Sequence, residues 1–430
     1  MSRSLPPRAP LASAKNLTDV ADAGPASRVA AGETPILDRK APFPPRVAPG
    51  SGLTAVLTVW FGAAIVLAAC WSFDRPPILR QWCRIEFRPW LLEQRDRIGL
   101  VGCGFSLVAA FYLMLAVHEL GHVVAGLCVG FRCRSLRVGP LLFNSPVRAS
   151  LYRGPGAVVQ GVAEMIPVAT DNLVRRGVVM VLGGPLANIL SATVVLLLPA
   201  TLFTTFFIVC SIVNAVNDLF PFESRLGVSD GRRIWMLLMQ PARGERWLAL
   251  LHLGGQLNDG VLPESLSAGF LAKAIAVRDA SVDTVQAYAI AYSAAFQQSK
   301  DDEAAERLEV SLTYAGGAAP GAREALMSDA AVFQARKRKR ADLAEQWLGE
   351  IPKTTHTSWL RSRAEAAILE AKGDFPGAVA KLSAVETAIL TLPNNARRDV
   401  LVRLLQRWKA ELLGASSHQR ESTGPGTREP

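Results

Sequence analysis

One stretch of the sequence, from Gly177 to Asn217, runs for 41 residues without a charged side chain. About 20 apolar residues in a helix cross the roughly 30 Å hydrocarbon core of a bilayer, because each residue rises about 1.5 Å. The stretch is therefore too long for one membrane span and has the right length for two, with the turn expected at residues 199–205. It excludes a simple soluble enzyme and predicts a helical hairpin that ends near Pro221.

Two further apolar runs lie upstream of this hairpin. Leu53–Trp71 is the centre of a charge-free segment and predicts a transmembrane anchor over residues 50–73. Residues 98–131 predict another span, which carries ionisable groups in its second half. We therefore expect an integral, multi-pass protein of a bacterial cytoplasmic (inner) membrane. The charges of the loops set its orientation only weakly, and the densely charged C-terminal region favours cytoplasmic N- and C-termini.

The two ends of the chain and one central loop differ from these spans in composition. Residues 1–49 hold nine of the 27 prolines and lack the apolar residues of a core, so they predict a disordered tail, as do residues 414–430. Residues 132–176 contain seven arginines, with short period-two apolar fragments between glycines and prolines. That pattern predicts short β-hairpins associated with the membrane.

Residues 241–413 are rich in alanine, leucine, glutamate and arginine at helical spacing, and they predict a helical cytoplasmic domain. Three segments in it look alike, each a helix, a polar turn and a second helix: 288–312, 326–348 and 360–382. Their equivalent leucines are about 40 and then 34 residues apart (Leu308, Leu348 and Leu382). Helix pairs at this period resemble tetratricopeptide repeats, and an irregular helical bundle is the alternative.

The fold class predicted from these patterns is mainly α. It combines a multi-pass membrane helical core, a small membrane-associated β region and a C-terminal α-helical, tetratricopeptide-like domain.

The sequence His118-Glu119-Leu-Gly-His122 has the HExxH pattern and lies inside a predicted span. Positions i and i+4 of a helix share one face, so both imidazoles can bind one Zn²⁺, while Glu119 can act as the base that activates water. Ionisable side chains inside a membrane helix are expensive, and this placement favours a function over a packing role.

A catalytic zinc ion needs a third protein ligand. Asp230 follows the hairpin closely, and a span that returns to the cytoplasmic side would bring it to the depth of the histidines. Asp218, at the end of the span, is the rival carboxylate. Three other histidines lie in the polar C-terminal region and resemble ordinary surface or packing residues (His252, His356 and His418).

Several motifs in one order resemble the site-2 protease family of intramembrane zinc metallopeptidases. They are the HExxH in a membrane helix, Gly-Gly-Pro-Leu-Ala-Asn from Gly183 to Asn188, then Asn217 and Pro221, and Ser229-Asp230-Gly231. The resemblance covers about residues 98–240. One departure is a longer spacing between Asn217 and Asp230 than the family usually has.

The resemblance implies a three-helix core, a zinc ion bound by His118, His122 and Asp230, and hydrolysis of peptide bonds within the membrane. It also implies that Asn188 and Asn217 lie close to the site, as candidates to position the substrate or its oxyanion. The β region then resembles the family's membrane-associated hairpins, which can pair with an unwound substrate.

The expected partners are a membrane-protein substrate, a protein partner for the C-terminal helical domain and anionic lipid headgroups near the basic loops. No nucleic acid is expected, because the basic runs lack interleaved aromatic residues. Two other classes of protein are alternatives. An inactive membrane-anchored scaffold that works through its helical repeats would be expected to have lost a site residue. A metal transporter would need more polar residues along several spans.

Overall fold

The protein was analysed as a computed structural model, which describes residues 34–38, 87–144, 148–152, 158, 160–224, 227–354, 357–391 and 396–422. The chain divides into two compact units. We call Pro49–Gly255 the membrane unit, and Met1–Ala48 together with Gln256–Pro430 the helical unit. This division lies past residue 241, where the composition changes. The expected anchor over residues 50–73 lies outside the described residues.

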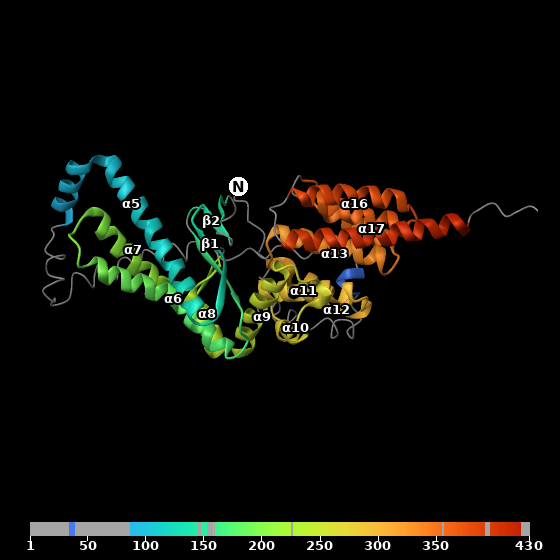
Figure 1. Ribbon diagram of the computed structural model, residues 1–430, viewed down its shortest axis with the longest axis horizontal. Coiled ribbons are helices and arrows are strands. Elements are labelled where there is room, and N and C mark those ends of the chain that lie inside the picture. Colours follow the sequence, from blue (N-terminus) through green and yellow to red (C-terminus); the bar gives the residue numbers. More distant parts are fainter. Residues whose placement is uncertain are drawn as a thin grey trace, which may run out of the picture. The chain divides into compact units, whose positions relative to one another are not determined.

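Three helices form the centre of the membrane unit: α5 (Phe87–Cys128), α6 (Leu173–Val195) and α7 (Leu202–Leu219). Each contains a segment long and apolar enough to cross a membrane, and each packs against the other two (Figure 1). The spans predicted around the HExxH motif and in the charge-free stretch are therefore confirmed as helices. The turn between α6 and α7 comes slightly earlier than expected, because Thr201 caps α7 by accepting a hydrogen bond from the Thr204 backbone N–H at 3.2 Å.

Helices α5 and α6 approach each other closely at two glycines. A Cβ atom on Gly121 would collide with the carbonyl oxygen of Gly183, and one on Gly183 would collide with that of Gly121. Small residues allow this close backbone contact between membrane helices. The crossing brings the HExxH segment of α5 against the Gly-Gly-Pro segment of α6.

The hairpins predicted for residues 132–176 are present as one antiparallel sheet. Its strands are β1 (Phe131–Val138), β2 (Leu141–Asn144), β3 (Arg148–Leu151) and β4 (Gly161–Pro167), in the order β3-β2-β1-β4. The register runs from Phe131 opposite Pro167 to Val138 opposite Gly161, with an irregularity after Cys133. Both β1 and β4 contact α5 (Figure 1), so one edge of the sheet lies beside the membrane helices.

After α7 the chain makes a short ribbon, β5 (Glu223–Ser224) with β6 (Gly227–Val228), followed by α8 (Asp230–Met239) and α9 (Pro241–Asn258). A buried cluster joins these helices to the rest of the membrane unit. It contains side chains from β1, β4, α6, α8 and α9 (Phe131, Met165, Met180, Val181, Met236, Leu237, Trp247 and Leu248). Because α9 supplies two of these side chains, it belongs to the membrane core.

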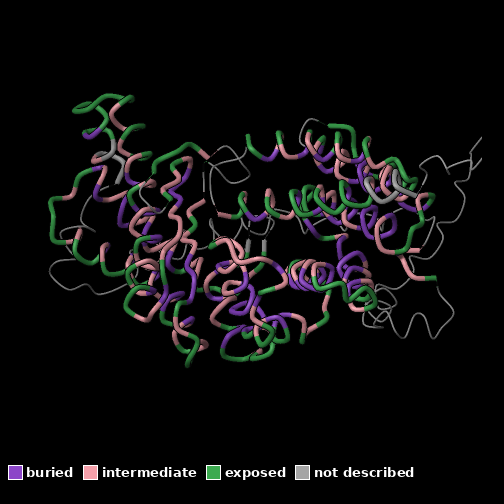
Figure 2. Tube along the Cα trace, turned by 45° about the vertical axis from the view of Figure 1, so that its right-hand side comes forward, coloured by how far each residue is buried: buried purple, intermediate pink, exposed green. Residues whose placement is uncertain are grey.

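The helical unit contains η2 (Pro263–Ser265), α10 (Ala268–Ile275), η3 (Ala315–Gly317) and three consecutive helix pairs with a final long helix. The pairs are α11 (Val282–Gln297) with α12 (Asp301–Tyr314), α13 (Pro320–Arg336) with α14 (Ala341–Glu350), and α15 (Ser358–Ala371) with α16 (Phe375–Leu390); α17 is Ala396–Ser422. Along these helices buried and exposed positions alternate (Figure 2). The three predicted helix pairs are confirmed, while their assignment as tetratricopeptide repeats stays a prediction.

Two segments predicted to be disordered are ordered in part. Helix α17 continues to Ser422, beyond residue 414, and Ile36–Asp38 form the 3₁₀ turn η1 within the N-terminal tail. Composition misses η1 because this turn is held by distant parts of the chain, and composition alone does not show where α17 ends.

Candidate metal centre

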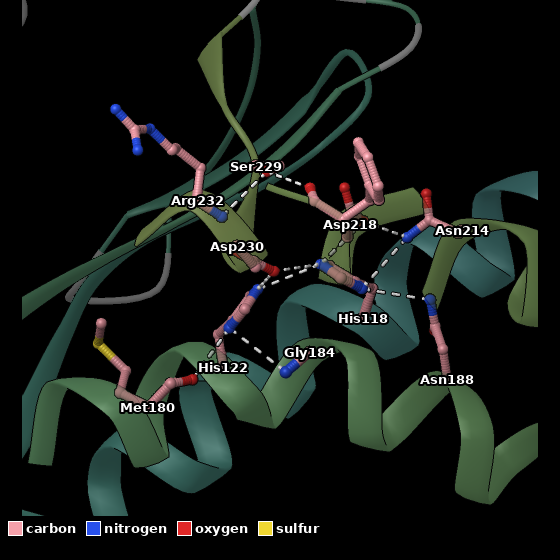
Figure 3. Close-up of polar contacts among 11 residues, drawn as sticks. His118, His122, Met180, Gly184, Asn188, Asn214, Asp218, Ser229, Asp230 and Arg232 are labelled. Carbon is pink, nitrogen blue, oxygen red and sulfur yellow. Dashed lines mark hydrogen bonds and ion pairs between the residues drawn. The ribbon is translucent and has the colours of Figure 1, made fainter. Parts of the chain in front are cut away.

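The two histidines of the HExxH motif lie one turn apart on α5 and point the same way. Their Nε2 atoms are 3.1 Å apart, and a carboxylate oxygen of Asp230, from the start of α8, completes a triangle with them (Figure 3). Asp230 Oδ2 lies 3.3 Å from His118 Nε2 and 3.1 Å from His122 Nε2. All three side chains are largely buried, so the structure brings together the three ligands expected from the sequence.

The triangle has the dimensions of a zinc site. Tetrahedral zinc with bonds of about 2.0–2.1 Å separates its ligand atoms by about 3.3 Å, close to the observed spacing. Within the described part of the chain, Asp230 Oδ2 is buried and receives no hydrogen bond, although it faces two ring nitrogens. A metal ion shared with the two ring nitrogens would satisfy this buried oxygen. Among the described residues, the group of three or more side chains able to share a metal ion is His118, His122 and Asp230.

Polar groups contact the Nδ1 atom of each ring, while the two Nε2 atoms face Asp230. The Nδ1 atom of His122 lies 3.0 Å from the carbonyl oxygen of Met180, closer than the 3.3 Å to the Gly184 backbone N–H, so Nδ1 carries the proton. The Nδ1 atom of His118 lies 3.2 Å from the amide of Asn188 and 3.3 Å from that of Asn214.

Asn188 is fully buried, and its amide nitrogen lies 3.2 Å from His118 Nδ1. Its Oδ1 has no hydrogen bond among the described residues. Such outer contacts fix the tautomer and the orientation of a histidine ligand. Asn188 therefore contacts an expected metal ligand, and its role near the substrate stays a prediction.

Local packing holds Asp230 against the histidines. Ser229 caps α8 by accepting a hydrogen bond from the Arg232 N–H at 3.2 Å, and its hydroxyl donates to the Phe220 carbonyl at 2.7 Å. A Cβ atom on Gly231 would collide with the carbonyl of Leu219, so only glycine allows α8 to begin this close to the end of α7. The Ser-Asp-Gly sequence thus fastens the third ligand to the last turn of α7.

Asp218, the rival third ligand, lies beside the site. Its Oδ2 is 3.6 Å from His118 Nε2 and accepts a hydrogen bond of 2.6 Å from the Asn214 amide. The metal group takes its three ligand atoms from His118, His122 and Asp230. Asp218 is therefore an outer carboxylate, which lies next to His118 and is not one of the three ligands.

Asn217 was singled out from the sequence as a site residue, but Asn214 was not. A polar side chain in the middle of an apolar span was the available signal for Asn214. The Oδ1 atom of Asn217 is buried and has no hydrogen bond among the described residues, and its role near the substrate stays a prediction.

Two glycines leave the space that the site needs. A Cβ atom on Gly184 would lie 2.8 Å from His118 Nε2 and closer still to His122 Nε2, inside the 3.0 Å that real Cβ atoms keep. A Cβ atom on Gly161, the first residue of β4, would collide with the carboxylate of Glu119. Glu119 is buried on α5 and points towards this edge of the sheet, and it is not one of the metal ligands.

Of the other three histidines, His252 has a described side chain, and it is not part of the metal group. His252 lies on α9 in the membrane unit, and its pKa is lowered by burial, although a hydrogen bond with the Pro167 backbone opposes the shift. His356 lies outside the described residues, and the side chain of His418 is not described.

Comparison with known proteins gives one family. Peptidase family M50, the site-2 protease family, matches residues 106–359, which is more than half of the chain. The match starts within α5 and continues through the helical unit as far as α15, well beyond the 98–240 suggested by the motifs. No curated protein and no solved structure matches the chain.

The family consists of membrane-associated zinc metallopeptidases, and the geometry of His118, His122 and Asp230 suits its metal. On the motif order, the metal triangle and this match, the chain belongs to peptidase family M50.

Proposed function

We propose that the chain is an intramembrane zinc endopeptidase that hydrolyses peptide bonds of membrane-embedded proteins. The observation that carries the proposal is the complete site, three converging ligands and a buried glutamate, built on helices of membrane-spanning length. An inactive scaffold would have no reason to keep all four residues.

The depth of the histidines supports cleavage within the membrane. His122 and His118 lie 6 and 10 residues before the end of α5 at Cys128. At about 1.5 Å per residue, that places them roughly 9 and 15 Å along the axis from the helix end. The helices also carry large apolar side chains on their outer faces, which suits contact with lipid tails (Leu100, Val101, Phe105 and Leu190).

The chemistry follows from the positions of the side chains. His118, His122 and Asp230 would hold the zinc ion, which would supply polarisation of the scissile carbonyl and acidification of water. Glu119 takes the proton from the attacking water and passes it to the departing amine. Met180 and Asn188 hold the two imidazoles through their Nδ1 atoms, and Asn214 ties Asp218 to the same cluster.

The open edge of β4 offers a place for the substrate backbone. Among the described residues β4 pairs only with β1, and its first residue, Gly161, lies against the Glu119 carboxylate. An extended segment that adds to this edge would run past Glu119 and the metal ligands. Because the backbone groups of a transmembrane helix are already paired, the substrate must unwind before it can add to the sheet.

The helical unit and the basic loops suit two further partners. Stacked helix pairs present an extended surface of the kind that binds proteins, so we propose a protein partner that selects or delivers the substrate. The arginine-rich loops next to the spans suit anionic lipid headgroups.

The test compares membranes from cells that contain the wild-type chain with membranes that contain Glu119→Gln. Mass spectrometry of newly formed peptide ends should show substrates cut inside or next to apolar segments only with the wild type. Equal sets of ends in the two membranes would contradict the proposal. A purified wild-type chain without stoichiometric zinc would favour the scaffold instead.

A further inference from the structure

The N-terminal tail contains a short ordered segment, Thr34–Asp38. Its backbone turns at Pro35, whose carbonyl accepts a 3.0 Å hydrogen bond from the Asp38 N–H, and residues 36–38 form η1. The Leu37 side chain is only 1% exposed. A five-residue segment cannot bury a leucine by itself, so its order comes from what it binds.

Both polar ends of the segment's backbone are bound by side chains of the helical unit. The Glu309 carboxylate, from α12, accepts hydrogen bonds from the Ile36 N–H at 2.6 Å and the Leu37 N–H at 2.8 Å. The Leu37 carbonyl accepts from Gln334 Nε2 of α13 at 2.7 Å and from Trp347 Nε1 of α14 at 3.2 Å.

These donors belong to a built site. With the segment in place Gln334 is fully buried and Trp347 is 5% exposed, so both donors lie away from solvent where they bind the Leu37 carbonyl. A buried donor without a partner is expensive, and the segment supplies that partner.

Charge complements the backbone contacts. The Asp38 carboxylate accepts hydrogen bonds from Gln334 Nε2 at 3.0 Å and from the Arg338 guanidinium, and Arg340 lies 4.0 Å away. Both arginines belong to the run Lys337-Arg-Lys-Arg340, which composition alone would assign to solvent or lipid headgroups. In the structure this run faces an acid of the same chain.

We propose that the crevice between α12, α13 and α14 is a peptide-recognition site, and that its occupant is this chain's own Ile36-Leu37-Asp38. The site selects two successive backbone N–H groups, an apolar side chain of leucine size and an acid directly after it. Residues 36–38 are thereby clamped to α12, α13 and α14, with more than 270 residues of sequence between Ile36 and Glu309.

The clamp also fixes the membrane topology. If α5, α6 and α7 each cross the membrane, as the proposed function requires, three crossings would separate residues 34–38 from helices α12, α13 and α14. The clamp holds both on one side, so the proposal calls for a further crossing, which the anchor predicted from the sequence over residues 50–73 would supply. The apolar run Leu53–Trp71 has the length for it.

Hydrogen exchange of the full-length chain in lipid nanodiscs tests the clamp. The peptide that contains residues 34–38 should exchange at least about tenfold more slowly in the wild type than in Leu37→Asp, because burying a leucine contributes about that factor or more. Glu309→Gln should also speed exchange. Glu306→Gln is the matched control, because Glu306 lies on the same helix and pairs with Arg278 instead. Equal exchange in the wild type and in Leu37→Asp would overturn the proposal.

A peptide titration tests the recognition site itself. A fluorescent peptide of residues 31–41 should bind saturably to the full-length Leu37→Asp chain, whose site is empty, and at least about tenfold more weakly to the wild type. The peptide concentration in the titration must reach about 1 mM, because a tethered segment competes at an effective concentration of that order. A peptide with Asp38→Lys should bind at least about tenfold more weakly to the Leu37→Asp chain. Equal binding of the two peptides, or none by either, would refute the site, whatever the result for proteolysis.

Discussion

Replacing Gly184 by alanine should remove zinc from the protein while leaving its helices intact. The new methyl group would lie 2.8 Å from His118 Nε2 and closer to His122 Nε2, so the rings would have to retreat by more than about 0.5 Å to reach an ordinary contact. Metal–ligand distances tolerate only about 0.2 Å. Zinc affinity should therefore fall by at least about 10- to 100-fold, the range seen when ligand orientation is disturbed.

The assay for this variant is zinc binding in competition with a chromogenic chelator, together with circular dichroism. Alanine favours a helix over glycine by about 1 kcal/mol, so the helical signal should be kept. Gly104→Ala is the matched control, because a Cβ atom there meets nothing within 4 Å on the same membrane helix that carries the histidines. Wild-type zinc affinity in Gly184→Ala would refute the assignment of the site.

Three other results are expected. Glu119→Gln should keep zinc and lose all cleavage, and loss of the metal would contradict its role as the base. Asp230→Ala should lose zinc, whereas Asp218→Ala should retain it; the reverse pattern would exchange their roles. A chain ended after residue 255 should insert, fold and bind zinc, whereas a chain ended after residue 240 should not. The shorter chain lacks Trp247 and Leu248 of the buried cluster, and losing each of these large side chains costs about 2–5 kcal/mol of stability. The measurements are the protease resistance and the zinc content of the two truncated chains. Equal values for the two chains would place α9 outside the core.

Local periodicity and length made the centre of the site predictable. The spacing of His118 and His122 fixes one face of a helix, and the absence of charge from residue 177 to 217 fixes two spans. Asp230 followed from topology, because a returning span delivers it to the histidines. These are short-range properties, and the structure agrees with each of them.

Features that depend on contacts between distant segments could not be predicted. Nothing in the pattern of α7 says that Asn214, rather than Asn217, reaches His118, because both lie on a continuous apolar helix. The space kept by Gly184 appears only when α6 crosses α5. Leu37 lies in a proline-rich tail whose composition predicts disorder, and its partners are hundreds of residues away.

Zinc X-ray absorption of Asp230→Cys tests the central claim most directly. A thiolate at this position would place a sulfur scatterer at about 2.3 Å from the ion, where the wild type has only nitrogen and oxygen at about 2.0–2.2 Å. Asp218→Cys is the matched control and should leave the spectrum without sulfur, because Asp218 is an outer carboxylate. Zinc–sulfur scattering in Asp230→Cys alone is the predicted result. A spectrum without sulfur in Asp230→Cys, or with sulfur in Asp218→Cys, would contradict the metal centre described for this peptidase.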